Sequence, residues 1–144
     1  MPAKVKRITL WRKELENRAG TLADTLDPLA KAGTDLQVVM GYCYPGDRTR
    51  AAVELFPIAT KKATAAAQGA GLAATGIPAL HVEGDNRAGV GSAITRALAG
   101  AGVNLDFLVA HVIGRKFSVV LGFENDADAD KAKALVKTAV TKKK

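Results

Sequence analysis

The chain has little of what many catalytic and secreted proteins depend on. It holds one cysteine, Cys43, which excludes an internal disulfide, and only two histidines. Aromatic residues make up 5% of the sequence, so small aliphatic side chains must supply most of the core. No apolar run approaches the roughly 18–20 residues that a membrane-spanning helix requires. These absences, with no signal-peptide pattern at the start, predict a cytoplasmic protein without a membrane segment.

The composition is that of a folded domain with a basic surface. Hydrophobic residues make up 48% of 144 residues, enough for a substantial core. The formal net charge is +7, and three of the lysines end the chain at positions 142–144. The other basic residues are scattered and form no basic helical face, which favours a solvated surface. A basic balance still leaves an RNA or phosphate-containing ligand as an alternative.

The chain repeats itself. The sequence Asn-Arg-Ala-Gly at residues 17–20 returns at residues 86–89, a shift of 69 positions, and residues 32–36 resemble residues 101–105 at the same shift. Each copy follows a strand-like run and opens a helix-like one. Two copies of one supersecondary unit predict a pseudo-symmetric protein in which equivalent loops have equivalent roles. The expected units are residues 1–76 and residues 77–144.

The hydrophobic periodicity gives both units the same element order. In the first unit it predicts strands and helices at residues 4–14, 20–32, 36–44, 48–58, 60–68 and 72–77. In the second unit it predicts them at residues 78–84, 89–101, 105–113, 116–123 and from 126 onward, with no obvious fourth strand. This is an α+β fold of two ferredoxin-like (βαββαβ) units with antiparallel sheets. The short connection between the units predicts that they pack side by side.

Motifs for catalysis or cofactor binding are incomplete. Residues 84–92 have the glycine spacing of a phosphate-binding loop, but Val90 stands where that loop requires lysine. The third glycine position of a dinucleotide fingerprint is occupied by Ile94. His81, His111 and Cys43 have no metal-ligand spacing. The sequence therefore predicts no catalytic residues, no metal and no cofactor, and hence a protein that is not an enzyme.

RNA-recognition domains share this element order, so nucleic acid is a further class of partner that the sequence could indicate. Those domains place exposed aromatic residues along one strand to stack bases. The corresponding strand here, residues 115–123, has Val119 at the central stacking position. Core packing explains Phe117 and Phe123 better, so a nucleic-acid partner is disfavoured.

The repeated loops are the best candidate sites. Asn17 and Asn86 each offer a carbonyl oxygen and an amide donor, which suits both ends of a zwitterion. Backbone N–H groups at the following helix start attract a carboxylate or phosphate, and glycine allows close approach. The alternative is that the asparagines are turn or capping residues and the glycines a steric necessity. The candidate ligand-binding residues are Asn17, Arg18, Ala19, Gly20, Thr21, Leu22, Asn86, Arg87, Ala88, Gly89, Val90 and Gly91.

Two longer segments resemble the opening of the ACT-domain family. They are ENRAGTLADTLDPLAKAGTDL, residues 16–36, and DNRAGVGSAITRALAGAGVNL, residues 85–105. The family typically has a strand, then Asp or Asn, a variable residue, Pro-Gly, a helix, and Ala-Gly-Val-Asn-Ile or a close variant before the second strand. The departure is Ala19 and Ala88, where the family commonly has proline. The resemblance covers nearly the whole chain as two tandem units.

The resemblance implies a fold, a ligand class and an assembly. It implies ferredoxin-like units that pair edge to edge through residues 36–44 and 105–113. It implies an amino-acid effector held between the first loop of one unit and a neighbouring unit, and it places the effector's polar groups at the candidate residues above. The low side-chain bulk of residues 89–92 predicts the roomier pocket in the second unit.

The expected function is therefore that of a stand-alone regulatory protein without catalysis. It would bind an amino acid or a similar small metabolite at the interface of two ACT-type units, and act as a homo-oligomer or on a regulated protein partner. The alternative is a ligand-free protein-interaction subunit. No membrane partner is expected.

Overall fold

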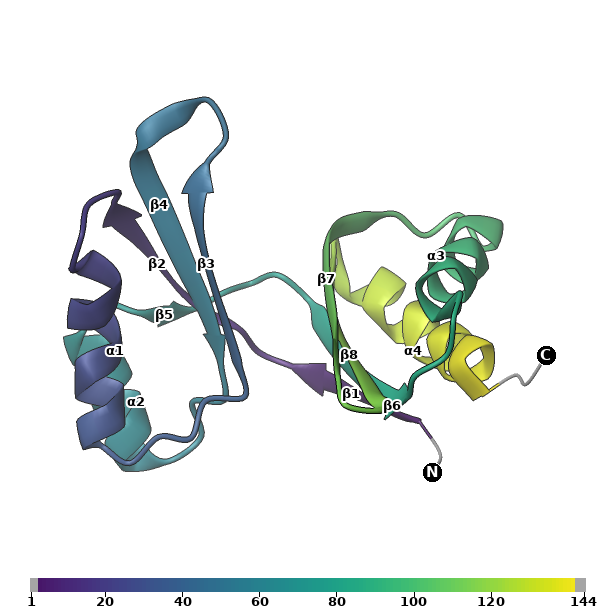
Figure 1. Ribbon diagram of the computed structural model, residues 1–144, viewed down its shortest axis with the longest axis horizontal. Helices are drawn as coiled ribbons and strands as arrows, with labels where there is room; N and C mark the ends of the chain where they lie inside the picture. Colours follow the sequence, from purple (N-terminus) through teal and green to yellow (C-terminus); the bar gives the residue numbers. More distant parts are fainter. Residues whose placement is uncertain (1–2, 142–144) are drawn as a thin grey trace. The chain divides into compact units, whose positions relative to one another are not determined.

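The computed structural model describes residues 3–141, which form two compact units (Figure 1). The first unit is Thr9–Gly76, and the second unit consists of the segments before and after it. Each unit holds a four-stranded antiparallel sheet and two helices. The fold class is thus α+β, with two ferredoxin-like units of ACT type. Among the helices of residues 3–141, none has the length and apolar character that a membrane crossing requires.

The first unit has a sheet with strand order β3-β4-β2-β5. Its core is formed by Leu29, Val53, Leu55, Ala67 and Leu72, with Trp11 and Leu15 packed against it. These side chains lie between the sheet and the two helices, because alternate residues of a strand point to the same face. The elements are β2 (Trp11–Glu16), α1 (Thr21–Lys31), β3 (Val38–Tyr44), β4 (Asp47–Phe56), α2 (Lys61–Gly69) and β5 (Ala73–Ala74).

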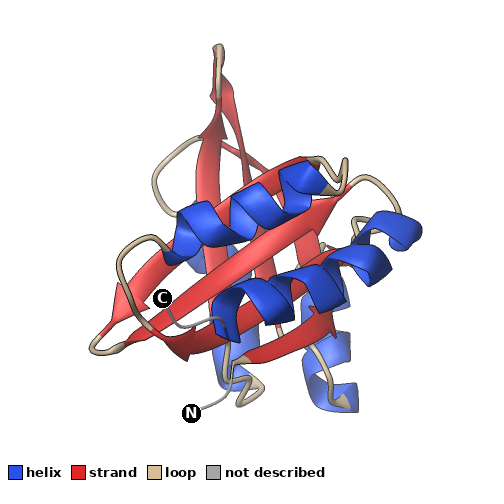
Figure 2. Ribbon diagram, turned by 90° about the vertical axis from the view of Figure 1, so that its right-hand side faces the viewer, coloured by secondary structure: helices blue, strands red, loops and turns tan. Residues whose placement is uncertain are grey.

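The second unit repeats this arrangement with strand order β1-β6-β8-β7. Two helices lie across one face of its sheet (Figure 2). The core lies between these helices and the sheet, is larger than that of the first unit, and includes Leu80, Val82, Ile94, Leu121 and Phe123. The elements are β1 (Lys4–Ile8), β6 (Ala79–Asp85), α3 (Val90–Gly100), β7 (Leu105–Ile113), β8 (Lys116–Phe123) and α4 (Asp126–Thr141).

The N-terminal segment corrects two sequence expectations. Residues 4–14 are two strands, not one: β1 pairs with β6 in the second unit, and β2 pairs with β4 in the first. In the first unit, the edge position beside β2 is filled by β5, the last strand of that unit. In the second unit, the equivalent position beside β6 is filled by β1. The fourth strand that the second half of the sequence lacks is therefore supplied from the start of the chain, and the units do not divide at a single cut after residue 76.

The edge-to-edge pairing expected for residues 36–44 and 105–113 concerns the strands β3 and β7. The strands β3 and β7 belong to separate four-stranded sheets and each lies at an edge. The edge strand β7 exposes apolar side chains on both of its faces: Leu108, Val109, Val112 and, at 70% of its surface, Ile113. An edge of this kind is a template for pairing with another strand.

Candidate functional site

The first repeated loop is tied to the hairpin that joins β3 and β4. The backbone N–H of Asn17 donates to the carbonyl of Thr49 (2.9 Å). Its side-chain Nδ2 donates to the carbonyl of Arg48 (2.6 Å) and approaches the Sγ of Cys43 (3.3 Å). The amide donor of Asn17 is therefore engaged within the first unit, and only its Oδ1 is left without a partner among the described residues.

The second loop makes the same backbone contact but not the side-chain contacts. The N–H of Asn86 donates to the carbonyl of Arg115 in the β7–β8 turn (2.8 Å). Within residues 3–141 the Asn86 side chain has no hydrogen-bond partner, and the residue is exposed. The position equivalent to Cys43 is Val112, which offers no acceptor. Both the amide donor and the carbonyl of Asn86 are thus available at the surface.

The glycine that ends each loop has a conformational role. Gly20 and Gly89 have φ angles of 95° and 86°, in the left-handed region, and each is the residue before the first helical turn. A Cβ on either would meet no atom within 4 Å. Backbone conformation, not lack of space, is the reason for glycine at both positions.

The helices that follow the loops begin without a side-chain cap. The N–H groups of Leu22 and Ala23 in α1, and of Gly91 and Ser92 in α3, have no acceptor within the described chain. The hydroxyl of Thr21 donates to the carbonyl of Glu16 (2.9 Å), so it does not act as a cap. Each junction therefore presents two neighbouring donors at the positive end of a helix dipole.

The second helix of each unit, in contrast, begins with a side-chain cap. The N–H of Ala63 in α2 donates to the Thr60 hydroxyl (3.0 Å), and the N–H of Asp128 in α4 donates to Oδ1 of Asn125 (2.8 Å). The uncapped helix starts are confined to the two repeated loops, among the four helices of the described chain.

The two loop arginines differ in their contacts. Nε of Arg18 pairs with Oε2 of Glu16 (3.0 Å) on the exposed surface of its own loop. Nη2 of Arg87 donates to the carbonyl of Ala139 in α4 (3.0 Å) and is partly buried. Neither guanidinium is without a partner.

A charged pair lies at the end of β6, next to the second loop. Nζ of Lys116 forms a hydrogen-bonded ion pair with Asp85, and this contact lowers the pKa of the Asp85 carboxyl to about 2. The carboxylate is exposed and stays ionised at neutral pH. Its charge is balanced by the ammonium group of Lys116.

Sequence reasoning missed a polar and aromatic cluster on the sheet face of the first unit that is opposite its core. Tyr42 and Tyr44 stack with ring centroids 6.1 Å apart, and the guanidinium of Arg50 lies 4.6 Å from the Tyr44 centroid. The Tyr42 hydroxyl donates to Oε2 of Glu54 (2.8 Å), a carboxylate that is 4% exposed. The spacing of the two tyrosines, two residues apart on a strand, is the signal that places both on one face.

One of the two histidines, His81, contacts a serine on the neighbouring strand β8. Nε2 of His81 lies 3.0 Å from the Ser118 hydroxyl, and burial lowers the pKa of His81, so it is neutral at pH 7. No group of three or more His, Cys, Asp or Glu side chains in residues 3–141 is arranged to hold a metal ion.

Comparison with known proteins gives structural likeness only. No protein-family model matches the sequence, and no curated protein matches it. Among solved structures, BT0572 from Bacteroides thetaiotaomicron superposes with a TM-score of 0.76 at 18% identity, over 93% of this chain and 89% of that one.

Two further structures carry a functional description of their own. The regulatory subunit of aspartate kinase from Thermus thermophilus, in a ligand-free form, gives a TM-score of 0.63 at 16% identity, over 96% of this chain and 97% of that one. A structure of aspartokinase alpha and beta subunits gives 0.64 at 15% identity, over 99% of both chains. At these identities the likeness shows the two-unit ACT-type fold.

Proposed function

We propose that this protein is a regulatory protein that binds an amino acid or a similar small metabolite at its repeated loops and performs no catalysis. The observation that carries the proposal is the pair of unpaired N–H groups at the start of α3, beside the free side chain of Asn86. A carboxylate is the natural partner of such N–H groups, and the Asn86 carbonyl is an acceptor for an ammonium group.

The fold supports the same proposal. Proteins with this two-unit architecture include regulatory subunits of aspartate kinase, one of them described in a ligand-free form. This chain of 144 residues aligns with 97% of that subunit. The proposal extends the regulatory role to this chain without assigning it the same partner or ligand.

The second loop is proposed as the stronger site. The Asn17 amide is committed to Arg48 and Cys43, whereas Asn86 has both polar atoms available. Gly91 and Ser92 are also smaller than their counterparts Leu22 and Ala23 taken together, so the second helix start is less obstructed.

A second proposal concerns assembly. The exposed apolar edge of β7 supports pairing with the same strand of another copy, because a two-fold axis makes such an edge self-complementary. A protein with this interface is a homodimer, and a ligand at the neighbouring loop then alters the association equilibrium. The same edge is also the feature that supports the alternative of a ligand-free interaction subunit.

Isothermal titration calorimetry of the twenty amino acids against the wild-type protein tests the proposed ligand class. At least one is expected to bind, and Asn86→Ala is expected to weaken that binding by about tenfold, since one lost charge-assisted hydrogen bond is worth roughly 1.4 kcal/mol. The matched control is Lys62→Ala, an exposed side chain in α2 of the first unit, which should leave the affinity unchanged. Absence of binding by every amino acid would contradict the proposal.

A further inference from the structure

The contact between Arg87 and α4 joins two distant parts of the second unit. Arg87 lies in the second loop, and the Ala139 carbonyl that accepts its hydrogen bond lies 52 residues later, in the last turn of α4. The last carbonyls of a helix lack intrahelical donors and form the negative end of its dipole. A guanidinium placed there satisfies an orphan acceptor and is attracted by the dipole.

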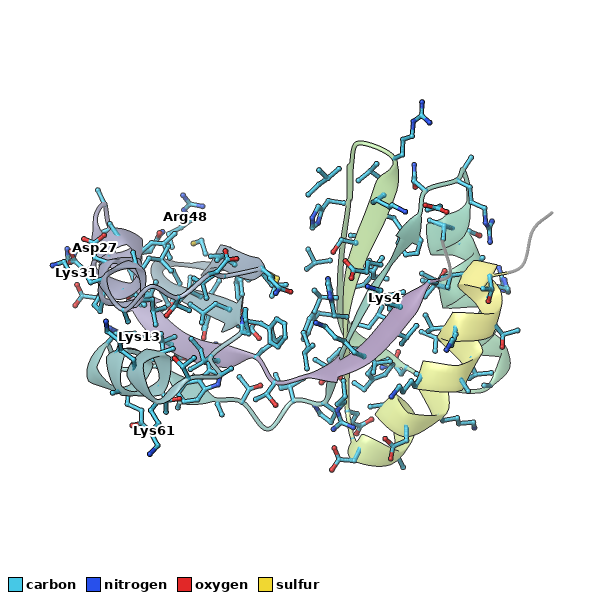
Figure 3. The ribbon with its side chains drawn as sticks, turned by 90° about the horizontal axis from the view of Figure 1, so that it is seen from below. Lys4, Lys13, Asp27, Lys31, Arg48 and Lys61 are labelled. Carbon is cyan, nitrogen blue, oxygen red and sulfur yellow. The ribbon has the colours of Figure 1, made fainter. Side chains whose placement is uncertain are left out.

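The first unit satisfies its equivalent helix end in another way. There the Ala70 carbonyl, at the end of α2, accepts from Nζ of Lys13 (2.7 Å), which comes from the strand β2 (Figure 3). Arg18, the loop arginine of the first unit, pairs with Glu16 instead. A cation reaches the second helix in both units, but only in the second unit does it come from the loop.

Helix length explains the difference. The helix α4 has 16 residues, whereas α2 has nine. Seven more residues extend a helix by about 10 Å, or two turns. The longer α4 packs along α3 and brings its last turn to the level of the loop that precedes α3. Arg18 has no hydrogen bond to the shorter α2 within the described residues.

We infer that Arg87 is a positioning residue: it fastens the second loop to the last turn of α4, so that this turn responds to what the loop binds. The second half of the inference rests on the proposed function. In this arrangement, ligand binding to the second loop changes the stability of the C-terminal turn of α4. Ligand binding to the first loop has no such effect on α2.

Hydrogen exchange of the ligand-free, full-length protein tests the positioning role without any ligand. The reporters are the N–H of Val90, which donates to the Arg87 carbonyl (3.3 Å), and the N–H of Ala93, which donates to the Gly89 carbonyl (2.9 Å). Arg87→Met keeps the aliphatic stem but removes the donor, and it should raise exchange at both reporters by about fivefold, as expected for the loss of one hydrogen bond. Arg87→Lys retains a donor and should restore part of the protection.

Arg18→Met is the matched control in the first unit. Its reporters are the N–H groups of Thr21 and Asp24, which donate to the carbonyls of Arg18 and Gly20. Because the Arg18 pair is exposed and local to its loop, exchange at these reporters should not change. Unchanged exchange at Val90 and Ala93 in Arg87→Met would overturn the positioning role.

The second arm adds each of the twenty amino acids in turn and follows exchange at residues 137–141. An amino acid that binds should slow exchange there in the wild type but not in Arg87→Met. If Arg87→Met abolishes binding while exchange of the ligand-free protein is unchanged, Arg87 is a ligand contact and the inference is wrong. If the ligand-free reporters respond to Arg87→Met but no amino acid binds to the wild type, the positioning role holds and the proposed function fails.

Discussion

The side chain of Asn17 donates from Nδ2 to the Arg48 carbonyl at 2.6 Å, whereas its repeat counterpart has no such contact. The repeated Asn-Arg-Ala-Gly motif therefore makes different contacts in the two units. In the first unit it fastens a loop to a hairpin. In the second unit it leaves an amide group exposed beside two unpaired backbone donors.

The first prediction follows from this difference. Asn17→Ala should lower the free energy of unfolding by about 0.5–1.5 kcal/mol, the usual contribution of a hydrogen bond. Asn86→Ala should leave stability almost unchanged, because no contact within the described chain is lost. Urea denaturation of both variants measures this, and equal losses of stability would show that the two asparagines are equivalent.

A second prediction concerns the buried carboxylate of Glu54. Its Oε2 accepts from the Tyr42 hydroxyl, and Oε1 is buried without a partner among the described residues. Tyr42→Phe removes the one donor and should cost about 1–3 kcal/mol of stability. The control is the same substitution in a Glu54→Leu background, where it should have little effect, since no carboxylate remains to be satisfied. Equal losses in both backgrounds would show that the hydroxyl acts elsewhere.

The pH dependence of stability gives a third prediction. Since Lys116 lowers the pKa of Asp85 to about 2, from an ordinary value of 3.8, the ionised pair stabilises the folded state above pH 4. This contribution is lost as the pH falls from about 4 to about 2. Asp85→Asn should therefore flatten the stability curve in that window and leave the slope at higher pH as it is. Thermal melting from pH 2 to pH 6 at low ionic strength measures it, and identical slopes for both proteins would contradict the assignment.

The fourth prediction addresses assembly through β7. Ile113→Glu places a charge on a side chain that is 70% exposed, so the unit should still fold. Charges brought close to each other across a two-fold axis repel, and the variant should be monomeric at concentrations where the wild type is dimeric. Sedimentation equilibrium reports the masses. The matched control is Val39→Glu on β3, an edge strand of the first unit's sheet. A dimer that survives Ile113→Glu but not Val39→Glu would move the interface to β3.

Much of the fold follows from local sequence signals. The strands at residues 105–113 and 116–123 and the start of the last helix at residue 126 agree with the structure. The repeat also predicted that both loops precede a helix, and this is confirmed, because α1 begins directly after Gly20 and α3 directly after Gly89. These features depend on periodicity and on residues with special backbone freedom, which are visible in a single sequence.

Other features depend on partners that are distant in sequence. No proline or glycine interrupts residues 4–14 to show that Ile8 ends a strand of one sheet while Trp11 begins a strand of another. The contacts of Arg87 with Ala139 and of Asn17 with Arg48 likewise join distant segments. The repeat alone made the two loops look alike, and only their different partners distinguish them.

The central claim is that the second loop binds an amino acid through the start of α3. Amide chemical shifts of 15N-labelled protein, titrated with the amino acids one at a time, test it most directly. The account predicts that at least one of them shifts the amide signals of Gly91 and Ser92 and the side-chain amide of Asn86, in a saturable manner, with smaller changes at Leu22 and Ala23. Saturable shifts confined to residues outside both loops, or no shifts at all, would contradict it.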